Sequence, residues 1–139
     1  MEGNPQKLFV RPILSSDALV WESMRCALWP DGNEDHRMEI AEFFAGTLDE
    51  PEVVVIATDT ENAVVGLVEL STRFNVPGLG GRKTGYVEGL YVIPAARQRN
   101  VARILLKKSR EWARKNECSH FASDRVDRIV IDRRFGSRS

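Results

Sequence analysis

One stretch, residues 86–116, constrains the fold more than any other part of the chain. Tyr86–Ile93 is rich in β-branched and aromatic residues, which predicts a central strand. Apolar residues then recur at helical intervals over residues 100–116, so a tight turn must lead from the strand into an amphipathic helix. The first turn of such a helix attracts phosphate, and Arg97 and Arg99 add positive charge beside it. A plain strand-to-helix connection also explains the turn, but not the order of the residue types.

Elsewhere the hydrophobic pattern predicts further strands and helices, separated by turns. Strands are expected at Leu8–Leu14, Val53–Ala57, Val64–Phe74 and His120–Ser123, and helices at Ala18–Leu28 and from about Asn33 to Gly46. Pro12 places the first strand at a sheet edge or a strand end. The second and third strands are expected to form a hairpin, and the glycine-rich segment Asn75–Gly85 is expected to be a loop.

Composition limits the class of protein. With 139 residues, 42% hydrophobic and 29% charged, the chain is expected to form one soluble domain. The net charge is zero, which argues against a nucleic-acid binder. The first 69 residues hold four Lys and Arg against 14 Asp and Glu, and the rest hold 16 against six. This asymmetry indicates either an interaction surface or two differently charged solvated faces.

The chain shows no sign of secretion, membrane insertion or metal binding. Cys26 and Cys118 lie far apart, and neither has another Cys or a His at metal-ligand spacing, so no disulfide or zinc site is expected. The first residues lack the apolar stretch of a signal peptide, and the longest aliphatic run, Val53–Ala57, is too short to span a bilayer. We therefore expect a cytoplasmic protein with no membrane partner.

The turn after the central strand resembles motif A of the GCN5-related N-acetyltransferases, the GNAT family, which takes the form Arg/Gln-x-x-Gly-x-Gly/Ala. The six residues that match it, and that the resemblance implies bind the pyrophosphate of coenzyme A, are Arg97, Gln98, Arg99, Asn100, Val101 and Ala102. Asn100 stands where the family has its first glycine. Because Asn tolerates the left-handed backbone conformation, we expect the turn and coenzyme A binding to be retained.

Within that family the chain is most similar to the aminoglycoside 6′-N-acetyltransferases, over residues 8–124. The similarity includes Arg25-x-x-Leu28-Trp29-Pro30, the central strand, the motif A turn, the helix with Trp112, and Ala122-Ser123-Asp124. It implies a mixed α/β fold with a mostly antiparallel sheet flanked by helices, a homodimer, and acetyl transfer from acetyl-CoA to an aminoglycoside without a metal. Another small amine as acceptor, or an inactive form that only binds coenzyme A, stays an alternative.

The resemblance also implies roles for individual residues. Glu88 is expected to hold the acceptor ammonium and remove its proton, because a protonated amine cannot attack a thioester. Asp124 is expected to bind the aminoglycoside and assist this step. The main chain of Leu90, Tyr91 and Val92 is expected to bind the pantetheine arm. Trp29 is expected to pack against a sugar ring of the acceptor, although a core position would also suit it.

Two further segments are charged. Residues 31–52 contain eight carboxylates against one arginine, a rim that would attract a polycation. Residues 125–139 do not follow the family pattern, so we expect a GNAT domain over 1–124, an incomplete C-terminal part of the fold and an arginine-rich tail over 125–139. Within that tail, Arg128–Phe135 could supply a substitute strand, including by exchange between two copies.

Overall fold

The computed structural model describes residues 7–125 and 128–132. Its strands are β1 (Phe9–Pro12), β2 (Val53–Thr58), β3 (Val64–Arg73), β4 (Thr84–Val92), β5 (His120–Arg125) and β6 (Arg128–Asp132). Its helices are α1 (Ala18–Leu28), α2 (Asn33–Ala45) and α3 (Val101–Lys115), each preceded by a short 3-10 turn. None of the helices in the described ranges is long and apolar enough to cross a membrane.

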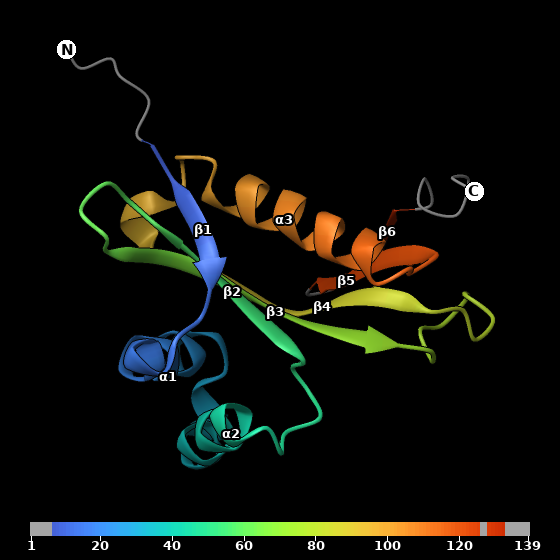
Figure 1. Cartoon of the computed structure of the whole chain (residues 1–139), viewed down its shortest axis with the longest axis horizontal. Helices are drawn as coiled ribbons and strands as arrows, with labels where there is room; N and C mark the ends of the chain where they lie inside the picture. Colours follow the sequence, from blue (N-terminus) through green and yellow to red (C-terminus); the bar gives the residue numbers. More distant parts are fainter. Residues whose placement is uncertain (1–6, 126–127, 133–139) are drawn as a thin grey trace.

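The six strands form one sheet in the order β1-β2-β3-β4-β5-β6. Every neighbouring pair is antiparallel except β4 and β5, which are joined through α3 and run parallel. Figure 1 shows α1 and α2 on one side of the sheet and α3 on the other. The expected mixed α/β fold with a mostly antiparallel sheet is therefore confirmed.

Each side of the sheet has its own apolar core, because successive residues of a strand point to opposite faces. On the α3 side, Val68 and Leu105 are fully buried in one cluster. On the α1 and α2 side, Trp21, Ile56 and Leu67 are fully buried in a second cluster. Each helical layer thus packs on the sheet through its own apolar cluster. A polar side chain of a central strand faces one of the two layers.

The junction between β1 and α1 is fixed by a charged cap. The Asp17 carboxylate accepts hydrogen bonds from the Leu14 main-chain N–H at 2.8 Å and from the Arg11 guanidinium at 2.8 and 3.2 Å. The hydrogen bond from Arg11 lowers the pKa of Asp17 below its usual value. Asp17 therefore ties the 3-10 turn Ser15–Asp17 to the edge strand, and as the N-cap residue of α1 it makes no side-chain capping bond to that helix.

Most expected elements match the structure, and the differences are local. β1 ends at Pro12 and lies at the edge of the sheet, and β2 and β3 form the expected hairpin. The loop after β3 is shorter than expected, because Thr84 and Gly85 already belong to β4 and pair with β5. Gly85 serves close packing here, since a Cβ on it would lie 2.6 Å from the Cβ of Ala113 in α3.

The arginine-rich segment contributes a strand to the sheet. β6 pairs antiparallel with β5 of the same chain, from Phe121 opposite Asp132 to Arg125 opposite Arg128. The expected substitute strand is confirmed over Arg128–Asp132, and residues 133–135 lie outside the described ranges. Exchange of this strand between two copies stays a prediction.

Candidate active site

A cavity of about 280 Å³ opens between α1, α2 and the sheet. It is lined by Arg25, Trp29, Asp35, His36, Glu39, Glu50, Pro51, Glu69 and Glu88. Two residues expected at the site from the sequence, Trp29 and Glu88, are both in its wall. We call this cavity the acidic pocket, since five of its nine lining residues are carboxylates.

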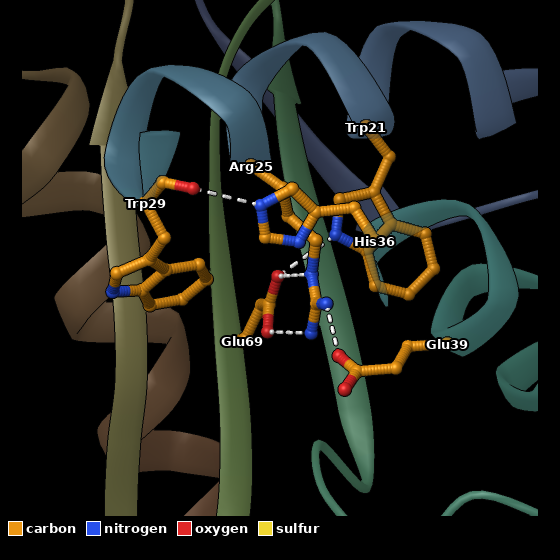
Figure 2. A network of polar contacts seen from close by, with 6 residues as sticks. All are labelled: Trp21, Arg25, Trp29, His36, Glu39 and Glu69. Atoms are coloured by element: carbon orange, nitrogen blue, oxygen red, sulfur yellow. Dashed lines mark hydrogen bonds and ion pairs between the residues drawn. The ribbon is translucent and has the colours of Figure 1, made fainter. Parts of the chain in front are cut away.

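One wall of the acidic pocket is the triad Glu69–Arg25–Glu39, in which Glu69 and Arg25 are buried and Glu39 reaches solvent (Figure 2). Arg25 donates to both carboxylate oxygens of Glu69, from Nε at 2.8 Å and from Nη2 at 2.9 Å, and its Nη1 donates to Glu39. Trp21 Nε1 adds a hydrogen bond of 2.8 Å to Glu69. The Glu69 side chain is 1% exposed and that of Arg25 5% exposed, so each charge depends on the other.

Arg25 stays cationic in this position. Burial lowers its pKa, but the hydrogen bond and charge of Glu69, followed by those of Glu39, outweigh burial, so the pKa is raised. Its guanidinium carbon lies 5.5 Å from the centre of the Trp21 ring and 5.6 Å from that of Trp29. Arg25 thus joins β3, α1 and α2, and its guanidinium packs against the indole ring of Trp29.

A second triad, Glu88–Arg73–Glu50, contributes two carboxylates, Glu88 and Glu50, to the pocket wall. Arg73 binds Glu88 at both oxygens, from Nε at 2.7 Å and from Nη2 at 2.8 Å, and reaches Glu50 at 3.2 Å. These contacts, led by the hydrogen bonds that Arg73 donates to Glu88, raise the pKa of Arg73. The guanidinium lies 4.6 Å from the ring centre of Tyr86. Glu88 is therefore held as an oriented carboxylate before any substrate binds.

The acidic pocket keeps a net negative charge after this pairing. Each triad combines two carboxylates with one arginine, and Asp35 adds another carboxylate to the wall. The outer carboxylates are open to solvent, since the side chain of Glu39 is 40% exposed and that of Glu50 49% exposed. Such a pocket favours a ligand with more than one positive charge. Across the described ranges no group of three His, Cys, Asp or Glu is arranged to hold a metal ion.

The indole of Trp29 can lie in the acidic pocket because residue 89 is a glycine. A Cβ on Gly89 would lie 2.6 Å from Cη2 and 3.0 Å from Cζ2 of the indole, so the ring packs directly on the β4 backbone beside Glu88. The His36 ring nitrogen Nε2 lies 3.0 Å from the Trp29 carbonyl oxygen. Trp29 remains 38% exposed, which excludes the core position considered for it and leaves a flat ring face in the pocket wall.

Substituting Gly89→Ala should displace this indole. Because the added methyl group would overlap the ring, we expect the free energy of unfolding to fall by about 1–3 kcal/mol and the tryptophan emission to shift. Urea unfolding followed by circular dichroism and fluorescence measures both. In a Trp29→Ala background the same substitution should cost much less, and an equal cost in both backgrounds would show that the overlap is relieved elsewhere.

The pairing of β4 with both neighbouring strands is interrupted at Glu88. Glu69 pairs with Gly89 and Leu70 with Val87, so Glu88 is the extra residue of a β-bulge. The parallel ladder with β5 ends one residue earlier, at Val87 opposite Ser123. Beyond that point β4 continues while β5 leaves it. The bulge therefore turns Glu88 toward the acidic pocket at the place where the sheet opens.

The opened edge of β4 contains part of the expected coenzyme site. The Ile93 N–H donates to Val65 of β3, and alternate residues of an antiparallel strand bond to the same neighbour. The main chain of Leu90 and Val92 therefore faces away from β3, toward the opening, whereas that of Tyr91 faces β3. The Val92 carbonyl already accepts a hydrogen bond of 2.9 Å from Arg97 Nε.

The turn into α3 has the expected backbone shape. Asn100 adopts φ 67° and ψ 18°, the left-handed conformation predicted for it, and makes no side-chain capping bond. α3 begins at Val101, so the first N–H groups of the helix lie directly after this turn. Arg97 reaches back to β4, with its guanidinium carbon 5.6 Å from the Tyr91 ring centre, and Arg97, Gln98 and Arg99 are all exposed.

Comparison with known proteins agrees with this geometry. Residues 17–129 match the model of the acetyltransferase (GNAT) family. The chain belongs to this family. As a GNAT protein it is 40% identical over 125 residues to an aminoglycoside N(6′)-acetyltransferase type 1 of Klebsiella aerogenes, an alignment that covers 89% of this chain and 80% of that protein.

Solved structures of two aminoglycoside acetyltransferases resemble most of this chain. The aminoglycoside 6′-N-acetyltransferase AAC(6′)-Ih of Acinetobacter baumannii is 27% identical, with a TM-score of 0.75 and coverage of 87% of this chain and 82% of that one. AAC(6′)-Iy in complex with the bisubstrate analogue CoA-S-monomethyl-acetylneamine is 25% identical, with a TM-score of 0.75 and coverage of 87% and 81%.

Asp124, the second catalytic residue expected for this GNAT chain, belongs to β5. The main chain of Asp124 lies in β5, opposite Ile129 of β6, but its side chain lies outside what the structure describes. β4 and β5 separate next to Ser123, so Asp124 follows the point at which the sheet opens. Its role stays a prediction.

Four residues of the GNAT site were not assigned to it from the sequence: Arg25, His36, Glu69 and Arg73. Glu69 offered a usable signal, because it is the single carboxylate within the otherwise apolar run Val64–Leu70. A charge at such a position needs a buried partner. Arg25 was noted for its motif alone, and nothing in the local pattern links Arg73 or His36 to the pocket.

Proposed function

We propose that this chain transfers the acetyl group of acetyl-CoA directly to the 6′-amine of an aminoglycoside antibiotic. The observation that carries the proposal is the position of Glu88, which lines the acidic pocket at the point where β4 and β5 separate. A polycationic acceptor in the pocket and a thioester along the opened edge of β4 would meet there. The names of the relatives support the same donor and acceptor.

Coenzyme A fits the residues around the opening. The main chain of Leu90 and Val92 faces it, and the left-handed turn at Asn100 presents the start of α3 to a pyrophosphate. In our proposal the coenzyme is held by the main chain of Leu90 and Val92 and by Arg97, Gln98, Arg99, Asn100, Val101 and Ala102. The main chain of Tyr91 faces β3, so Tyr91 acts only through its ring, which packs against Arg97. When bound, acetyl-CoA supplies an acetyl group activated as a thioester, and no metal takes part.

Glu88 prepares the acceptor amine in this proposal. Arg73 occupies one hydrogen-bonding position on each Glu88 oxygen, and a carboxylate oxygen has a second lone pair for an ammonium or a water. Glu88 therefore orients the 6′-ammonium and accepts its proton, directly or through water. Asp124 assists, and Trp29 packs its exposed ring face against the sugar.

A thiol-release assay tests the proposal. Purified protein is mixed with acetyl-CoA, and free coenzyme A is measured with kanamycin, with spermine or with no acceptor. Kanamycin-dependent release supports the proposal. Release with spermine alone would instead identify a polyamine acetyltransferase, and binding of acetyl-CoA without any amine-dependent release would identify an inactive coenzyme A-binding form.

The outer carboxylates should act through long-range attraction. Substituting Glu50→Gln removes one exposed charge of the acidic pocket, so we expect KM for kanamycin to rise about two- to fivefold at low salt and less at high salt. Steady-state kinetics at two ionic strengths measure this. Glu61→Gln in the turn between β2 and β3 is the matched control, and an equal effect there would mean that overall charge alone is responsible.

We also propose a cytoplasmic homodimer with its catalytic domain over residues 1–124. Both cysteines are free thiols, as expected in a reducing compartment. β6 is the last strand of the described sheet, and an edge strand offers main-chain groups for pairing with a second copy. Light scattering with size-exclusion chromatography should give twice the 15.7 kDa mass of one chain.

A further inference from the structure

His36 carries a polar atom that the acidic pocket leaves without a partner. Its side chain belongs to α2, is 4% exposed and lines the pocket. Figure 2 shows Nε2 directed at the Trp29 carbonyl oxygen, 3.0 Å away. A carbonyl oxygen only accepts hydrogen bonds, so Nε2 must carry the hydrogen. In the neutral ring the other nitrogen, Nδ1, then presents a lone pair.

That lone pair is buried and unsatisfied within the part of the chain that the structure describes. A buried polar atom without a hydrogen bond costs about 1–3 kcal/mol, so such atoms usually have a partner that is a ligand or a water. Ser71 Oγ is a second such atom among the described residues. Ser71 lies between Glu69 and Arg73 on β3, and alternation places all three side chains on the pocket side of the sheet.

The charge of the acidic pocket indicates which kind of group donates a hydrogen bond to Nδ1 of His36. Asp35 and Glu39 lie on the same helix as His36, and the two triads add net negative charge to the pocket wall. A ligand drawn into this field carries ammonium groups, which only donate hydrogen bonds. Nδ1 only accepts in the neutral ring, so the two are complementary.

We infer that His36 binds the amine substrate directly, with Nδ1 accepting a hydrogen bond from a second ammonium or a hydroxyl group while Nε2 holds Trp29. This inference rests on the proposed function, because it assumes an amine-rich acceptor in the acidic pocket. It makes His36 a specificity-determining residue. An acceptor that keeps the reacting amine but lacks the ammonium or hydroxyl group bound by Nδ1 would lose this contact.

Two substitutions separate the two ring nitrogens. The side-chain amide of Gln reaches the position of Nε2, and that of Asn the position of Nδ1. His36→Gln should keep Trp29 in place but weaken kanamycin binding about tenfold, which corresponds to one net hydrogen bond. His36→Asn should bind kanamycin more tightly than His36→Gln. Calorimetry with kanamycin and with acetyl-CoA measures both sites, and acetyl-CoA affinity should be unchanged.

The wild-type chain offers an independent readout. It contains two histidines, so histidine labelled with ¹⁵N gives a simple spectrum. Adding kanamycin should shift the Nδ1 resonance of His36 and leave its Nε2 resonance nearly unchanged. A static Nδ1 resonance on saturation, or weaker binding by His36→Asn than by His36→Gln, would overturn the inference and leave the proposed function intact. If the wild-type chain binds neither kanamycin nor spermine, the inference about His36 and the proposed function are both wrong.

Discussion

Replacing Arg25 with methionine should lower the free energy of unfolding by about 3–5 kcal/mol, because it leaves the Glu69 carboxylate buried without its countercharge. Glu69 is 1% exposed, and its remaining partner would be the Trp21 indole N–H. The substitution also removes the guanidinium that packs against Trp29 and frees Glu39. We therefore expect loss of stability together with loss of the acidic pocket, measured by urea unfolding and kanamycin binding.

A second substitution tests the cause of that loss. In Arg25→Met/Glu69→Gln the buried charge is absent, and Gln can still accept the hydrogen bond from Trp21. Much of the stability should return, whereas kanamycin binding should not, because Glu39 and Trp29 remain unsupported. No recovery in the double variant would mean that Arg25 stabilises the fold through packing instead of charge.

Substituting Glu88→Gln should reduce turnover by about 10²- to 10⁴-fold, the range that a positioned general base contributes. Gln keeps the shape of the side chain but can neither hold an ammonium by charge nor accept its proton. Acetyl-CoA affinity should stay the same, because the coenzyme-binding main chain of Leu90 and the turn at Asn100 do not involve this carboxylate. Stopped-time assays with kanamycin and calorimetry with acetyl-CoA measure the two quantities.

Loss of the ion pair with Arg73 is the main complication for this variant. The Glu88 side chain is 16% exposed, so the thermal midpoint of Glu88→Gln should be measured beside that of Glu50→Gln, which removes the other partner of the same arginine. Turnover by Glu88→Gln equal to that of the wild type would remove Glu88 from the mechanism. A parallel loss in Glu50→Gln would assign the effect to Arg73.

The elements that depend on local pattern could be predicted from the sequence. The passage from β4 through the turn to α3 follows from periodicity, and Asn100 adopts the left-handed conformation expected from its tolerance of positive φ. Pro12 correctly indicated an edge strand. The expected end of the loop at Gly85 was wrong. This glycine lies in β4, where it allows close packing against Ala113, but in the sequence it looks like one more loop residue.

The contacts that build the acidic pocket could not be predicted in the same way. Glu69 accepts hydrogen bonds from Arg25 and Trp21, which lie 44 and 48 positions earlier in the chain. Such pairing depends on how α1 is placed over the sheet. Among the carboxylates of residues 31–52 whose side chains the structure describes, Asp35, Glu39 and Glu50 line the pocket. Their choice depends on the orientation of α2, which composition does not reveal. The bulge that turns Glu88 inward is equally a property of strand pairing.

The most direct test compares two aminoglycosides that differ only at the 6′ position. Neomycin has an amine there and paromomycin a hydroxyl group, so both should enter the acidic pocket but only one presents a reactive nitrogen beside Glu88. With acetyl-CoA labelled in the acetyl group, nuclear magnetic resonance of the products should show one amide, on the 6′-nitrogen of neomycin, and no product from paromomycin. Acetylation of both compounds, or of neither, would contradict the placement of Glu88 at the reacting amine.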